Sequence, residues 1–154
     1  MIAAMALLAN AVVQQPLPAG PAPDAFPQPA DTAALSIVVA ETVDQTDPQS
    51  LCPQASCTSL FLATFKTVRT IAGPEMPAAF AARMEMGSPF DARHTIAMIV
   101  ERLPNGSWIV RTSRGFHWQT HEACLDLVEA KAVGWVTSAS GATRRGDEIC
   151  VTKD

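Results

Sequence analysis

Residues His94–Arg114 read HTIAMIVERLPNGSWIVRTSR. Apolar residues dominate both of its halves, and a turn-forming Asn105-Gly106 pair lies between them. Asn-Gly is a strong hairpin signal, because both residues tolerate the positive φ angles of a turn whose twist matches that of the flanking strands. The stretch therefore predicts two antiparallel strands, residues 94–102 and 107–114, joined by a tight turn.

Three more strands are predicted upstream of this hairpin, over residues 35–43, 60–71 and 79–86. The first is a β-branched run, and the second carries apolar side chains at alternate positions. The third alternates apolar and polar side chains with the period of two that is typical of a half-buried strand. Gly-Pro and Gly-Ser-Pro sequences end the second and third runs, because glycine and proline interrupt regular strands.

One helix is predicted after the hairpin, from an N-cap at Thr120 to a stop at Gly134. At helical spacing one face would hold His121, Cys124, Leu125, Val128 and Ala132, and the other Glu122, Asp126 and Glu129. The first of these faces is expected to pack on the sheet. A polar loop over residues 137–149 is expected to return the chain to the buried side of the helix.

The order of these elements predicts a mainly β fold, a small five-stranded OB-like barrel with one C-terminal packing helix. A curled antiparallel sheet covered by the same helix is the alternative. Residues 33–154 form a single domain in both interpretations, and a domain of about 120 residues can bury an adequate core.

The N-terminal residues have a different composition and are assigned to two other segments. Residues 1–13 contain a short apolar run that ends in the A-x-A pattern of Ala9-Asn10-Ala11, which resembles a signal peptide. No Lys or Arg precedes this run, so a frayed terminus or part of an anchor is the alternative. Residues 14–32 are a proline-rich linker that favours an extended spacer. These features predict an exported protein, periplasmic or extracellular, with no membrane span in its mature form.

The four cysteines, Cys52, Cys57, Cys124 and Cys150, form an even set. In an exported protein, an even set predicts two disulfides. Three pairings are open to four cysteines. Cys52 with Cys57 and Cys124 with Cys150 is the favoured pairing, because short loops close most easily.

The formal net charge of −4 and the scattered basic residues argue against a nucleic-acid partner. Nucleic-acid binding needs a basic face for the phosphates, and no block of Lys or Arg exists here. An unidentified protein or envelope component is the expected partner.

The second strand resembles a known family in the pattern Phe61-x-x-x-Phe65-Lys66-x-Val68-x-x-Ile71-x-Gly73-Pro74. Together with the Val-rich strand before it, residues 35–87 resemble the netrin-like module, which includes the tissue inhibitors of metalloproteinases. The resemblance implies an OB-type barrel, secretion and disulfides. Those inhibitors bind the protease zinc through an N-terminal cysteine, whereas the first cysteine here is Cys52, so the resemblance carries over no inhibitory residue.

The spacing His117-x-x-x-His121-x-x-Cys124 is a candidate metal site. Two histidines four residues apart on a helix can share a metal, and a cysteine one turn later supplies a third ligand. The alternative function is therefore a periplasmic metal-binding protein. A turn histidine and a bridged cysteine are the structural interpretation of the same residues, and the pattern lacks the Glu after the first His that a zinc hydrolase needs.

The favoured function is a non-catalytic binding module that uses the loops at residues 45–57, 87–94 and 114–121. Trp118 and His94 are its candidate binding residues, because exposed aromatic side chains often mark binding surfaces. No cofactor is predicted. A hydrolase is the third hypothesis, and it has no motif in its favour, since no serine lies in a G-x-S-x-G turn.

Overall fold

The computed structural model describes residues 34–46, 49–50, 58–86, 93–132 and 141–154. Within these ranges the chain forms nine strands and no helix longer than a single 3₁₀ residue. The strands are β1 (Leu35–Gln45), β2 (Gln49–Ser50), β3 (Ser59–Ala72), β4 (Ala79–Met86), β5 (Thr95–Arg102), β6 (Trp108–Gly115), β7 (Glu122–Asp126), β8 (Ala142–Arg145) and β9 (Glu148–Thr152).

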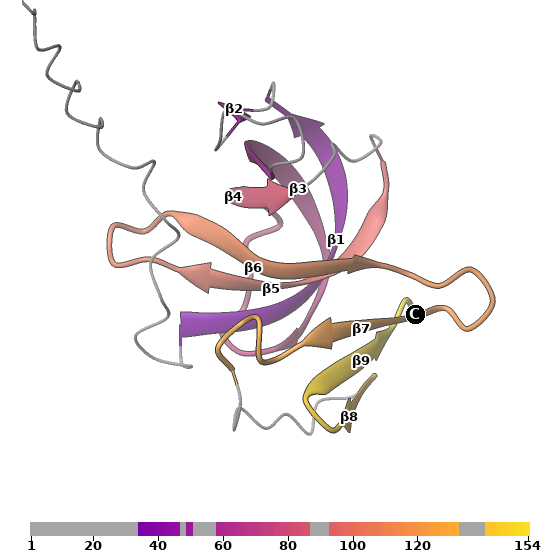
Figure 1. The fold of residues 1–154 in the computed structure, drawn as a ribbon. Helices are drawn as coiled ribbons and strands as arrows, with labels where there is room; N and C mark the ends of the chain where they lie inside the picture. Colours follow the sequence, from indigo (N-terminus) through magenta and orange to yellow (C-terminus); the bar gives the residue numbers. More distant parts are fainter. Residues whose placement is uncertain (1–33, 47–48, 51–57, 87–92, 133–140) are drawn as a thin grey trace, which may run out of the picture.

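Five of the strands close into a barrel, in the order β1-β5-β6-β4-β3, with β3 pairing back onto β1 (Figure 1). Four of the five contacts are antiparallel, and the β4–β6 contact is a short parallel one. The short strand β2 adds to the edge of β3. The prediction of a closed, mainly β barrel is confirmed, and the five strands predicted from the sequence are β1, β3, β4, β5 and β6.

The barrel interior is filled by alternate residues of its strands, as the period-two pattern requires. On β3 the side chains that point into the interior are Phe61, Ala63 and Phe65, and Phe65 stacks on Phe80 of β4 at 5.3 Å between ring centroids. The interior cluster consists of Val38, Ala40, Phe61, Ala63, Phe65, Met76, Phe80, Ala82, Met84, Ile96, Met98, Val100 and Val110.

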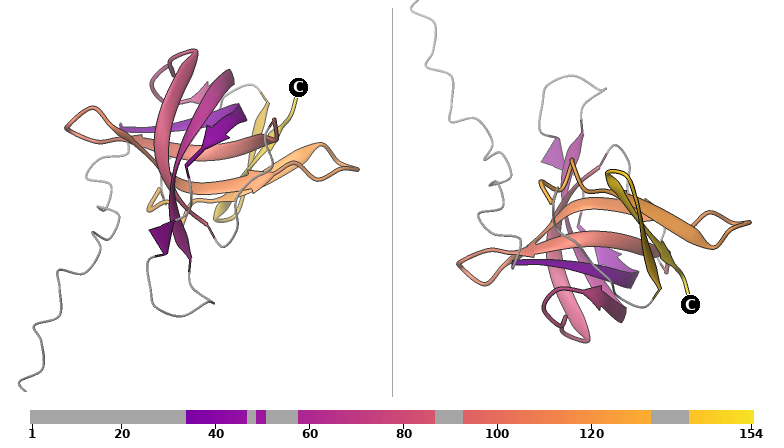
Figure 2. Two further views of the ribbon diagram at one scale, coloured as in Figure 1. Left: turned by 90° about the horizontal axis from the view of Figure 1, so that it is seen from above. Right: turned by 90° about the horizontal axis from the view of Figure 1, so that it is seen from below.

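A second, three-stranded sheet with the order β7-β9-β8 covers one side of the barrel (Figures 1 and 2). It packs on the outer face of β1 and β5, so residues 35–40 and 96–100 are buried on both sides. Strands buried on both faces read as continuous apolar runs. The cluster between barrel and sheet consists of Leu35, Ile37, Val39, Ile71, Ala97, Ile99, Ala123, Leu125, Leu127, Ala130, Ala132, Ile149 and Val151.

The prediction of a C-terminal helix is wrong for those of its residues that the structure describes. Residues 122–126 form strand β7, and residues 127–131 form turns. β7 is paired along its whole length with β9, a segment that lies far away in the sequence. Asp126 then ends the strand, since its carboxylate accepts the backbone N–H groups of Val128 and Glu129 at 2.7 and 3.1 Å. Asp and Asn favour such local turns over helix interiors.

The polar loop predicted for residues 137–149 is also corrected in its described part. Residues 142–145 and 148–152 form the β8–β9 hairpin, whose turn contains Gly146 with a φ of 63°. The hairpin places Cys150 beside Cys124, on the strand next to it and not below a helix.

The signal-like residues 1–13 and the linker 14–32 lie outside the described ranges, so their assignment remains a prediction. Among the described elements there is no helix of the length and apolarity needed to cross a membrane.

Candidate functional site

The connection between β6 and β7 is a narrow loop that projects from one end of the barrel (Figure 1). Two backbone hydrogen bonds close its base. The N–H of His117 donates to the carbonyl of Glu122 at 2.9 Å, and the N–H of His121 donates to the carbonyl of His117 at 2.9 Å. Phe116, just before the loop, packs against the cluster between barrel and sheet. We call residues His117–His121 the Trp118 tip, and these contacts close its base.

Trp118 is the most exposed large apolar side chain among the described residues, with 78% of its surface accessible. The other exposed ones, Val43, Leu62, Val68 and Val128, are smaller and 48–55% exposed. Trp side chains are usually well buried. An indole exposed at the end of a projecting loop is therefore unusual unless another molecule covers it.

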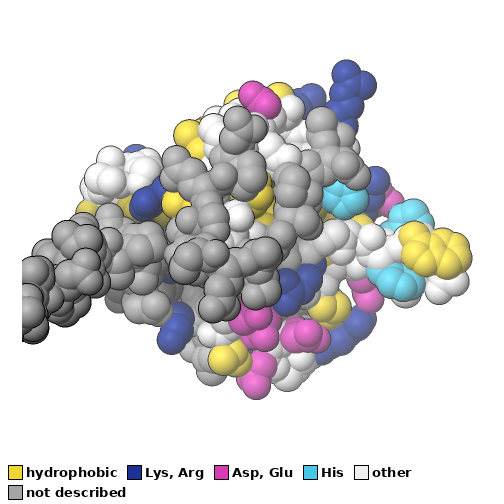
Figure 3. Space-filling view, turned by 45° about the horizontal axis from the view of Figure 1, so that its top comes forward, with side chains coloured by type: hydrophobic (Ala, Val, Ile, Leu, Met, Phe, Trp, Pro, Cys, Tyr) yellow, Lys and Arg dark blue, Asp and Glu magenta, His cyan; other side chains and the backbone are white. Residues whose placement is uncertain are grey.

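The three histidines of the chain lie at one end of the molecule, where two of them border an exposed apolar group and the third lies further back (Figure 3). The ring of His117 stacks beside the indole of Trp118 at 6.3 Å between centroids, and its Nδ1 accepts the N–H of Gln119 at 3.3 Å. His94, which directly precedes β5, lies beside the end of β6, since its Nε2 lies 3.2 Å from the position of a Cβ on Gly115. The structure therefore brings His117 and Trp118 into contact and places His94 and His121 at the same end of the molecule; all four were predicted as candidate residues.

The base of the tip is tied to the second sheet. Glu122 forms an ion pair with Arg145 of β8 at 3.0 Å, and the N–H of Lys153 donates to the carbonyl of His121 at 3.0 Å. These contacts hold the base of the tip at the second sheet, and the tip itself presents an indole and imidazole rings.

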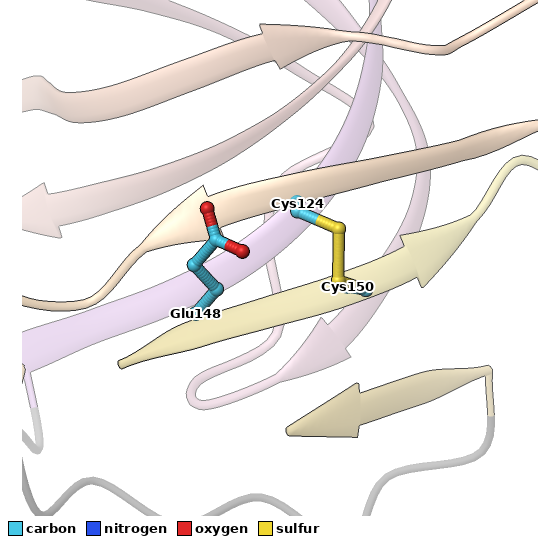
Figure 4. Close-up of side chains that lie close together, drawn as sticks. All are labelled: Cys124, Glu148 and Cys150. Atoms are coloured by element: carbon cyan, nitrogen blue, oxygen red, sulfur yellow. A yellow bond between two sulfur atoms is a disulfide. The ribbon is translucent and has the colours of Figure 1, made fainter. Parts of the chain in front are cut away.

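Cys124 is not available to the predicted metal site, because its sulfur is bonded to Cys150 (Figure 4). The two cysteines face each other across β7 and β9, which matches the favoured pairing. The Cys52–Cys57 pairing lies outside the described residues.

Cys124, Cys150 and Glu148 form the one group of three potential metal ligands found in the described ranges, all within 4.8 Å. A metal ligand is a thiolate and not a disulfide sulfur, so the bridged form offers the Glu148 carboxylate alone. His117, His121 and Cys124 do not form such a group.

A pocket of about 390 Å³ lies at the other end of β5 and β6, and the sequence did not predict it. Arg102 and Trp108 pair across these strands at its edge, with the guanidinium 5.8 Å from the centre of the indole ring. The other lining residues are Ala34, Pro74, Glu75 and Pro77. Strand pairing places Arg102 opposite Trp108, and the fold brings the β3–β4 connection to them.

The other loops predicted to bind are described in part. In loop 45–57 the described residues are 45–46 and 49–50, and in loop 87–94 they are Arg93 and His94. The His94 backbone is held by Thr42, whose N–H donates to the His94 carbonyl at 3.0 Å. The His94 N–H in turn donates to Thr42 Oγ1 at 3.0 Å.

No family model, no curated protein and no solved structure matches this chain.

Proposed function

We propose that the chain is an exported, non-catalytic binding module that inserts Trp118 into an apolar pocket of a protein or envelope component. The observation that carries this proposal is the 78% exposure of Trp118 on a loop that is closed by backbone hydrogen bonds. A loop whose base is closed before binding loses less backbone freedom on binding, so more of the burial energy of its indole appears as affinity.

The expected contribution of Trp118 is that of an interface hot spot. Trp is enriched among such residues, and truncating one to alanine typically costs about 2 kcal/mol or more, which is about 30-fold in Kd. His117 beside the indole, with the other histidines at this end of the molecule, would contribute to the polar rim of a buried anchor.

The fold that we propose for this module is the OB type. Numbered along the chain, the barrel strands pair in the order first, second, third, fifth, fourth, and the fourth pairs with the first. The resemblance of residues 35–87 to the netrin-like module supports the same assignment. OB folds present ligand-binding loops on a five-stranded Greek-key barrel, so a projecting loop is a natural place for recognition.

Export is supported by the Cys124–Cys150 bridge, because disulfides persist in oxidising compartments and are rare in the cytosol. The A-x-A pattern at Ala9-Asn10-Ala11 is the second argument. An oxidising compartment also keeps Cys124 away from metal chemistry, which favours the binding module over the metal-binding alternative.

Site-specific photo-crosslinking tests the proposed function. A photoreactive phenylalanine analogue replaces Gln119 beside the indole, and a matched control replaces Pro104, an exposed residue of the β5–β6 turn at the opposite end of β6. We expect one predominant adduct with a partner from position 119, lost when Trp118→Ala is added, and no such adduct from position 104. Adducts that persist in the Trp118→Ala background would show that the tip is not the binding element.

A further inference from the structure

The pocket beside Trp108 suits the chain's own proline-rich segment. We propose that residues 24–32, DAFPQPADT, bind there in an extended polyproline conformation, with the prolines lying against the indole. The proposal does not depend on Trp118, which lies at the opposite end of β6.

The pocket is formed in advance, because its proline wall is fixed to the barrel. The Pro74 carbonyl accepts the hydroxyl of Ser36 at 2.7 Å, and the Pro77 carbonyl accepts the hydroxyl of Thr67 at 2.5 Å. Between them Met76 is buried in the barrel interior, and its N–H donates to Thr70 Oγ1 at 3.1 Å. A ligand would therefore meet a rigid surface, which lowers the entropic cost of binding.

The lining has the chemistry that recognises proline-rich chains. Trp108 is half-buried and is held edge-on by Phe80 at 6.1 Å, and it shares the pocket with Pro74 and Pro77. Aromatic-lined grooves are the usual docking sites of polyproline segments. Such segments lack proline N–H donors and leave their carbonyl oxygens free, and Arg102 offers five N–H donors at the pocket edge.

The segment is joined to the barrel beside the pocket. Ala34, the first described residue, lines the pocket itself, and Pro29 comes only five residues before it. At about 3.1 Å per residue in a polyproline conformation, Pro29 lies within about 16 Å of Ala34 along the chain. Such a short connection gives an effective concentration in the millimolar range, which can hold even a weakly binding segment.

The charges of the segment do not oppose this placement. Asp24 and Asp31 are its only charged residues, and Phe26 is its only aromatic one. The pocket offers one positive and one negative side chain, Arg102 and Glu75. The apolar part of the segment, from Phe26 to Pro29, is thus the part that we expect on the indole.

Paramagnetic relaxation enhancement in the full chain tests the proposal. A nitroxide on Gln28→Cys should broaden the amide signals of Glu75, Arg102 and Trp108 and leave that of Trp118 unchanged. The control carries the same label together with Phe26→Ser, Pro27→Ser and Pro29→Ser, and we expect the broadening to be lost. Because residue 28 is tethered near the pocket, equal broadening in both chains would mean tethering alone and would overturn the proposal, as would no broadening in either chain.

A peptide experiment identifies the occupant. A peptide of residues 24–32 should bind the triple serine chain and fail to bind the wild-type chain, whose pocket is already filled. Arg102→Ala in the triple serine chain should abolish peptide binding, and this exposed residue can be changed without disturbing the core. Equal binding of the peptide to the wild-type chain would show that the pocket is open to a separate proline-rich partner, which contradicts an internal occupant.

Discussion

Gly73 follows β3 at a point where no side chain fits. Its φ is +82°, and a Cβ there would lie 2.1 Å from the carbonyl oxygen of Leu35. Gly106 in the β5–β6 turn has the same φ and no atom within 4 Å of that position. Alanine substitutions at the two glycines therefore distinguish the free-energy cost of a strained backbone from that of a steric collision.

We expect Gly73→Ala to lower the free energy of unfolding by about 3 kcal/mol or more, and Gly106→Ala by about 1 kcal/mol. The first change adds a backbone collision to the left-handed φ, and the second adds only the φ penalty. Urea unfolding of both variants measures the difference. Equal losses would mean that the approach of Gly73 to Leu35 does not constrain the fold.

Glu101 of β5 and Arg111 of β6 form a buried ion pair between neighbouring strands. Their side chains are 5% and 6% exposed, and Arg111 Nε donates to Glu101 Oε2 at 2.6 Å. Removing one partner of a buried pair leaves the other charge without compensation. The exposed pair of Arg114 and Glu129, at 51% and 54%, is the matched comparison.

Glu101→Gln should therefore destabilise the protein by about 3 kcal/mol, whereas Glu129→Gln should change its stability by less than about 0.5 kcal/mol. Thermal unfolding of the two variants under one condition gives the comparison. If Glu101→Gln lowered the stability as little as Glu129→Gln, the buried ion pair would contribute nothing to the pairing of β5 with β6.

Among the elements, β7 shows what local sequence patterns leave undecided. Ala123, Leu125 and Leu127 are buried at alternate positions, but the same stretch also places Leu125 and Val128 on one face of a helix. A strand forms in place of the helix because β9 supplies backbone partners from residues 148–152 and because the Cys124–Cys150 bridge joins the two strands. Contacts over such a sequence distance are invisible to a window of a few residues.

The second sheet should contribute to stability as part of the core. Leu125→Ala removes a fully buried side chain from the cluster between barrel and sheet, and we expect a loss of about 3 kcal/mol. Val128→Ala, two residues beyond the strand and 49% exposed, should cost no more than about 0.5 kcal/mol. Chemical denaturation measures both. A small loss of stability in Leu125→Ala would indicate that the sheet packs only loosely on β1 and β5.

At the scale of the whole molecule, the barrel could be predicted from the sequence. The reasons are the turn at Asn105-Gly106, the alternation in residues 79–86 and the apolar runs at 35–40 and 96–100. The parallel β4–β6 contact and the second sheet could not, because nothing local specifies which distant strands pair. Trp118 could be suspected from its position, but its exposure follows from the loop that the β6–β7 connection forms.

Native mass spectrometry of the chain recovered from the cells that produce it, compared with Trp118→Ala, shows whether the Trp118 tip binds a partner. Because Trp118 is 78% exposed, the variant should fold like the wild type, and its unfolding curve is the control. We expect a specific complex for the wild-type chain and the chain alone for the variant. The same complex in both samples, or none in the wild type, would contradict the claim that the Trp118 tip binds a partner.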